Sequence, residues 1–140
     1  MRETTEALLT RYFEAFNAGD TDGMLALVAD DLRHDVNQGE TRLGKEAFTE
    51  FNAHMTACYK ERLSDLVLMT DATGERASAE FIVHGEYLRT DEGLPEAKGQ
   101  TYYLPAGTFF EVSQGKIQRI TTYYNLSDWI VQVVGPDGDY

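Results

Sequence analysis

Residues 11–31 read RYFEAFNAGDTDGMLALVADD, and this stretch decides the fold. It predicts an amphipathic helix, a sharp turn and a second short helix. The apolar residues of the first helix recur at helical spacing, which places Tyr12 on its buried stripe with Leu8, Ala15 and Phe16. Gly19 suits the left-handed position that ends a helix, and Asp20 can cap the next one. The second helix should bury Met24, Leu27 and Val28.

After this helical pair the pattern changes to strands with one further helix between them. The expected elements are a strand over 32–38, a short edge segment after Gly39 and Glu40, a helix over 45–59, and strands over 63–70, 77–89, 100–113 and 116–127. Helices followed by long antiparallel strands predict an α+β fold. Residues 129–134 are strongly apolar, and the pattern leaves open whether they form a helix or a strand.

Composition limits the classes of function. The chain of 140 residues is expected to be one domain over 1–134 with a flexible tail over 135–140. A formal net charge of −12 argues against nucleic acid and against anionic membrane surfaces as partners. The polar start of the chain lacks the apolar core of a signal peptide, and no stretch is long enough to span a membrane. With Cys58 as its only cysteine, we expect a cytoplasmic protein without an intramolecular disulfide.

Three segments carry a resemblance to a known superfamily. They are Arg11-Tyr12 with NAGDTDG at 17–23, FIVHGEY at 81–87, and Pro105 followed downstream by Gly115-Lys116. In this order the chain resembles the ketosteroid isomerases and SnoaL-like polyketide cyclases of the NTF2-like superfamily. The resemblance implies a cone in which three N-terminal helices pack against a curved, mostly antiparallel sheet. It further implies an apolar pocket for a small hydrophobic ligand, a homodimer formed through the sheet, and chemistry without a cofactor.

The resemblance assigns candidate catalytic residues near the start of the chain. Tyr12 matches the tyrosine that donates a hydrogen bond to the enolate oxygen in ketosteroid isomerases. Val36 stands where that family has its catalytic aspartate, and adjacent strand residues face opposite sides. Two alternatives therefore remain. A bulge brings Asp35 and Asn37 inward, or His34 and Val36 face the pocket; His34 would be a plausible base near neutral pH.

The strands supply the expected pocket lining. Gly107 aligns with the family's second donor, an aspartic acid, and Tyr103 on the same strand is a possible replacement. By strand parity the other pocket-facing candidates are Phe81, Val83, Phe109, Ile120, Thr122 and Tyr124. His84 and Glu86 fall on the opposite face, where the resemblance implies contact with a second subunit.

Two classes of function follow from these residues. Tyr12 with Asp35 or His34 favours an enzyme that performs acid–base isomerisation or cyclisation of a hydrophobic carbonyl compound. Gly107 and Val36 at the family's acid positions favour a binding protein without catalysis. His34, His54 and His84 share no ligand spacing, so the sequence predicts no metal site.

Overall fold

The computed structural model describes residues 1–135, so the expected tail lies, apart from Gly135, outside the described residues. Its elements in chain order are α1 (Arg2–Ala18), α2 (Thr21–Leu25), β1 (Val28–Val36), β2 (Thr41–Leu43), α3 (Lys45–Cys58), β3 (Tyr59–Thr70), β4 (Arg76–Tyr87), β5 (Thr101–Ser113), β6 (Lys116–Tyr124) and α4 (Leu126–Val134). The apolar segment that the sequence left undecided is therefore a helix, α4.

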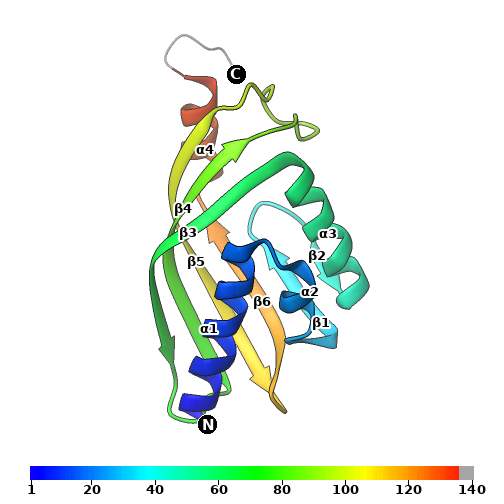
Figure 1. Cartoon of the computed structure of the whole chain (residues 1–140), viewed down its shortest axis with the longest axis vertical. Coiled ribbons are helices and arrows are strands. Elements are labelled where there is room, and N and C mark those ends of the chain that lie inside the picture. The colour runs from blue at the N-terminus through cyan, green and yellow to red at the C-terminus, as the bar shows by residue number, and fades with distance from the viewer. Residues whose placement is uncertain (136–140) are drawn as a thin grey trace.

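One curved sheet with strand order β2-β1-β6-β5-β4-β3 organises the chain. All neighbouring strands are antiparallel except β1 and β6, which are parallel. Helices α1, α2 and α3 lie on one side of the sheet, and α4 lies at the end nearest the C-terminus (Figure 1). The α+β prediction is confirmed. The expectation of three N-terminal helices holds only in part, because β1 and β2 separate α2 from α3 and a fourth helix follows the sheet.

The quoted helical pair forms with one correction: α2 ends at Leu25 and buries Met24, so the prediction that this helix also carries Leu27 and Val28 is wrong, and Val28 begins β1. Gly19 ends α1 with a φ of 70°, and the Asp20 carboxylate accepts a hydrogen bond from the N–H of Gly23 at 2.9 Å. The Asn17 side chain bonds both backbone groups of Leu63, at 3.0 and 2.8 Å. These contacts fasten α1 to β3 and hold the buried face of α1, with Tyr12, against the sheet.

The junction of α3 and β3 differs from the prediction. The helix ends at Cys58 and the strand begins at once at Tyr59, so residues 59–62 are extended rather than helical or irregular. Register with β4 pairs Glu61 with Gly85 and Leu63 with Val83. Residues directly opposite on paired strands share a face, so Glu61 lies on the inner face of the sheet, toward the helices.

Candidate functional site

An internal cavity of about 230 Å³ lies between the helices and the inner face of the sheet. Most of its walls are aromatic or aliphatic side chains, among them Phe13, Phe16, Phe48, Phe51, Met55 and Leu104. A few polar groups interrupt this lining. Such a cavity fits a small hydrophobic molecule held in orientation by a few hydrogen bonds.

Tyr12 reaches the cavity from the buried face of α1. Its ring packs edge-on against Phe13 and Phe110, with centroids 5.4 and 6.1 Å away. Burial raises the pKa of Tyr12, so the phenol stays protonated. Within residues 1–135 its hydroxyl makes no hydrogen bond, although a buried tyrosine usually finds a partner. A ligand oxygen in the cavity can fill that role.

His34 is the polar side chain that β1 sends into the cavity. It is only 4 % exposed and lies edge-on between the rings of Phe48 and Phe51, at 4.9 and 4.6 Å. Burial, helped by the positive charge of Arg42, lowers the pKa of His34 to about 4. Its Nδ1 is buried without a hydrogen-bond partner among the described residues. At neutral pH the imidazole is uncharged, which makes it a weak base but a good hydrogen-bond donor.

The structure decides between the two alternatives for β1. His34 and Val36 line the cavity, so the prediction that places Asp35 and Asn37 there is wrong. The Asp35 carboxylate accepts hydrogen bonds from Thr41 and Thr121, at 2.6 and 2.9 Å, on the other face of the sheet. Burial opposes its ionisation, but these bonds and Arg33 outweigh burial and lower the pKa of Asp35. Asn37 instead bonds the backbone of Tyr124 just beyond β1.

The prediction that Tyr103 and Phe109 line the pocket is also wrong. Phe81 pairs with Ala106 and Val83 with Leu104, so the even-numbered residues of β5 face inward. Tyr103 and Phe109 face outward and are 54 % and 47 % exposed. Gly107 points outward too, and Thr108 occupies the inner face, bonded to Thr122 at 3.3 Å between their hydroxyl oxygens. The remaining predicted lining residues, Phe81, Val83, Ile120, Thr122 and Tyr124, all line the cavity.

Glu61 is a cavity residue that the sequence reasoning missed. Burial raises the pKa of its carboxyl, although a hydrogen bond from the Tyr102 hydroxyl partly offsets the effect. Tyr102 lies opposite Gly85, and a Cβ on that glycine would lie 2.0 Å from the Tyr102 ring. The glycine therefore leaves the space through which Tyr102 crosses to reach Glu61 on the next strand. The result is a partly buried carboxyl, held by a neutral donor, at the wall of an apolar cavity.

Comparison with known proteins places this geometry in a family. The family model of the SnoaL-like domain matches residues 9–120. The chain belongs to the SnoaL-like family. A structure from Pseudomonas putida KT2440, of a protein proposed as a polyketide cyclase, is 57% identical over 90% of this chain and 95% of that one, with a TM-score of 0.89. Another protein proposed as such, from Silicibacter sp. TM1040, is 56% identical over 95% and 97% of the two chains, with a TM-score of 0.92.

More distant structures agree on the fold alone. An NTF2-like protein from Burkholderia xenovorans LB400 is 16% identical over 95% of this chain and 98% of that one, with a TM-score of 0.76. The SnoaL-like domain therefore shares its fold with an NTF2-like protein. None of the curated proteins compared with the chain matches it. Across residues 1–135 the helices are too short or too polar to cross a membrane.

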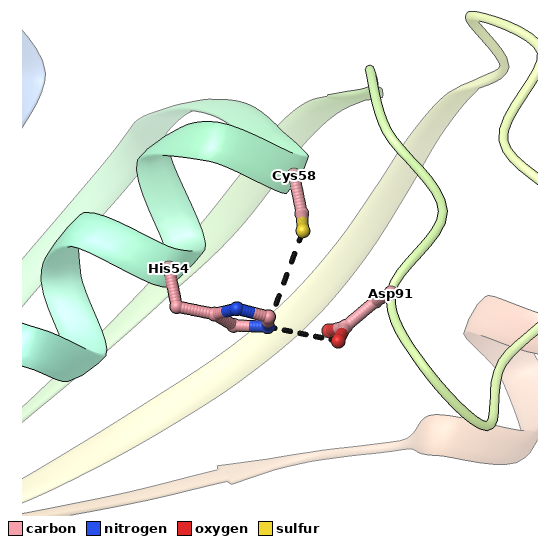
Figure 2. A group of neighbouring side chains, drawn as sticks. All are labelled: His54, Cys58 and Asp91. Atoms are coloured by element: carbon pink, nitrogen blue, oxygen red, sulfur yellow. Dashed lines mark hydrogen bonds and ion pairs between the residues drawn. The ribbon is translucent and has the colours of Figure 1, made fainter.

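Of the three histidines in the SnoaL-like domain, only His54 lies beside other potential metal ligands in the described part of the chain. His34 packs between phenylalanines, and His84 bonds the Ser64 hydroxyl at 2.6 Å, so neither lies with His54. His54 instead lies next to Cys58 and Asp91, with their donor atoms within 4.8 Å of one another (Figure 2). Asp91 also lines the cavity. This mixed group is the one set of three metal-ligating residue types that gather within the described part of the chain.

Proposed function

We propose that this SnoaL-like protein is an enzyme that isomerises or cyclises a small hydrophobic carbonyl compound by moving a proton within the cavity. The observation that carries the proposal is the combination of one carboxyl with a raised pKa, Glu61, and two uncharged donors, Tyr12 and His34, at the same apolar cavity. Two close relatives carry names that describe them as proposed polyketide cyclases, and this supports the same class of reaction.

In the proposed chemistry Glu61 takes a proton from the carbon next to a carbonyl group. Its raised pKa makes the carboxylate a stronger base than an ordinary glutamate. Negative charge then develops on the carbonyl oxygen, where the Tyr12 hydroxyl and an N–H of His34 can hold it. The enolate is either reprotonated at a different carbon, which is isomerisation, or attacks a second carbonyl of the same molecule, which closes a ring.

Replacing Tyr12 by phenylalanine tests this proposal. Loss of one preorganised donor to an oxyanion is expected to lower kcat about a hundredfold, with His34 still present as the second donor. The measurement is a continuous ultraviolet assay in which β,γ-unsaturated ketones, a 3-ketosteroid among them, are converted to conjugated enones. Cyclisation is followed with a linear β-polyketone. Phe16→Leu, which changes the lining without removing a hydroxyl, is the matched control. Equal rates in the wild type and in Tyr12→Phe would contradict the proposed role.

One observation favours the alternative of a binding protein without catalysis. Val36 faces the cavity from β1 and Asp35 faces away, so this strand brings no carboxyl to the ligand. A pure binding protein would hold the same ketones at saturation without converting them. Its affinity would change with the apolar lining and would be unaffected by Glu61→Gln, whereas an enzyme would lose turnover.

We further propose that a second copy of the chain covers the outer face of the sheet. Three aromatic side chains, Tyr103, Phe109 and Tyr123, are each about half exposed on that face, and Phe109 packs edge-on against Tyr123 at 5.7 Å. Exposed aromatic patches of this kind are typical of interaction surfaces. Light scattering after gel filtration should give twice the chain mass of 15.8 kDa.

Phe109→Glu should shift this mass to that of a single chain, because the new carboxylate would be buried without a partner. Leu43→Glu on β2, which changes another exposed apolar residue away from the aromatic group, is the control and should remain dimeric. A single-chain mass for the wild type at micromolar concentration would contradict the proposed dimer.

A further inference from the structure

Three electron-pair donors from two segments converge beside the cavity. Figure 2 shows the imidazole of His54 and the thiol of Cys58 extending from α3 toward the carboxylate of Asp91 in the following loop. Nε2 of His54 lies 2.8 Å from Oδ1 of Asp91 and 4.0 Å from Sγ of Cys58. All three donor atoms lie within 4.8 Å of one another.

Local structure explains why the three side chains meet. His54 and Cys58 are four residues apart on α3, and residues at that spacing share one face of a helix. The backbone oxygen of Cys58 accepts hydrogen bonds from the N–H groups of Leu88 and Arg89, at 2.8 and 3.3 Å. These bonds fix the start of the loop that carries Asp91 against the end of α3.

A further contact orients the carboxylate. The Tyr59 hydroxyl donates to Oδ2 of Asp91 at 2.7 Å, which leaves Oδ1 directed toward His54. The backbone N–H of Asp91 donates to the Tyr87 hydroxyl at 2.9 Å, so the residue is held at both its main chain and its side chain. Hydrogen bonds that fix a ligating carboxylate in this way are a regular feature of metal sites.

Protons can satisfy the contact between His54 and Asp91 but not, at the same time, the longer contact between His54 and Cys58. Nε2 carries at most one hydrogen, which it can donate to Asp91, and the Cys58 thiol then faces a nitrogen that no longer accepts its proton. When Nε2 accepts from the thiol instead, it has nothing to donate to a carboxylate 2.8 Å away. A cation between the three atoms interacts favourably with all of them at once, because each can direct a lone pair toward it.

We propose that His54, Cys58 and Asp91 bind a zinc ion at the edge of the cavity. One imidazole, one thiolate and one carboxylate form a donor set that suits Zn²⁺ and does not suit Mg²⁺ or Ca²⁺. Zinc bonds of about 2.0 Å to nitrogen and oxygen and 2.3 Å to sulfur require donors roughly 3.3–3.5 Å apart. Binding would draw the three donor atoms together from their present separations of at most 4.8 Å. His54 is half exposed, so the ion can enter from solvent.

The site goes beyond the proposed acid–base function. Asp91 and Tyr59 belong both to the zinc site and to the cavity wall. Three protein ligands leave a fourth position for water or for an oxygen of the cavity's ligand, as in open zinc sites. Neither Tyr12, His34 nor Glu61 takes part in it. Zinc binding and turnover can therefore be measured separately, and failure of one leaves the other intact.

Calorimetric titration of the metal-free protein with ZnCl₂ is the test. We expect saturable binding of one ion per chain and none with MgCl₂ or CaCl₂. CoCl₂ should give a near-ultraviolet thiolate-to-cobalt charge-transfer band, which reports on Cys58 alone because the chain has one cysteine. His54→Gln, Cys58→Ser and Asp91→Asn should each weaken Zn²⁺ binding by about a hundredfold or more. His84→Gln, on the outer face, is the matched control and should bind as the wild type does.

Two results would overturn the proposal. One is the absence of saturable Zn²⁺ binding by a protein that circular dichroism shows to be folded. The other is binding whose affinity is the same in His54→Gln and in His84→Gln, because the ion would then be held elsewhere. Since Cys58 is buried and its replacement can disturb packing, Asp91→Asn provides an independent check. The asparagine can keep an oxygen for the Tyr59 hydroxyl, and it replaces the charged ligating oxygen by an amide NH₂ that cannot bind the cation.

Discussion

Replacing Glu61 by glutamine is expected to lower kcat by about 10²–10⁴-fold and to leave KM nearly unchanged. The amide has almost the same shape as the carboxyl and can still accept the hydrogen bond from Tyr102. It cannot take a proton from carbon, so the change removes the base and little else. The measurement is steady-state turnover of the best ketone in the assay described above, with thermal unfolding to show that the variant is folded.

The control for this prediction is Glu80→Gln, which neutralises an exposed carboxylate on β4 outside the cavity. It should retain wild-type turnover. If Glu61→Gln also retains it, Glu61 is not the base, and the chemistry proposed for the cavity loses its proton acceptor.

The pH profile gives a second check on Glu61. Burial raises its pKa above the ordinary carboxyl value of 4.5, and the base works only when ionised. Activity should therefore begin to fall, as pH decreases, at a pH above 4.5. The hydrogen bond from Tyr102 stabilises the charged carboxylate, so Tyr102→Phe should move this fall to a still higher pH. If the activity of the wild type and of Tyr102→Phe fell at the same pH, the pH dependence would belong to another group.

The first helix with its turn and strand β4 were predictable because the local signals in each agree. In α1 the helical spacing of apolar residues places Tyr12 on the buried face, and Gly19 and Asp20 mark the turn. In β4 small and apolar residues alternate with polar ones, so the inward positions of Phe81 and Val83 follow from parity. Each of these assignments depends only on residues that are close together in the sequence. The sequence alone therefore contains the information needed to make it.

The wrong assignments on β5 have a specific cause. Aromatic residues occur there as adjacent pairs, Tyr102 with Tyr103 and Phe109 with Phe110, so the aromatic residues alone favour neither parity. The rest of the strand did carry a signal, because Leu104 and Val112 share the even parity whereas Glu111 and Ser113 share the odd one. The register with β4 agrees with that signal and buries the even-numbered member of each pair. On β1 the pairing with β6 shifts between Val28 and Arg33, which left the side on which Asp35 lies undecided by counting along the chain.

Glu61 was missed for a different reason. It stands between Lys60 and Arg62, and a run of alternating charges usually marks a solvated segment. The expected helix also reached Tyr59 and the expected strand began at Leu63, so Glu61 belonged to neither. A signal was nevertheless present. Had the strand been extended backwards from Leu63, parity would have placed Glu61 on the buried side with it.

Acidification is expected to destabilise the protein through His34 by about 3 kcal/mol. Burial lowers the pKa of His34 from 6.5 to about 4, so between these values the unfolded chain binds a proton that the folded chain refuses. The contribution of His34 to the free energy of unfolding therefore falls as pH decreases from 6.5 to 4. It does not change further below 4, where His34 is protonated in both the folded and the unfolded state. Above 6.5 the residue has no effect on the pH dependence.

Urea unfolding at a series of pH values from 7 to 4 measures this effect when the wild type is compared with His34→Leu. Carboxyl groups contribute to the acid dependence of both proteins, so the difference between the two curves isolates the imidazole. His84→Leu, which removes a histidine outside the cavity, is the matched control. Parallel curves for the wild type and His34→Leu would mean that the folded protein accepts a proton on His34 near 6.5. His34 would then be charged at the cavity under mildly acidic conditions, and its proposed role as a neutral donor would fail there.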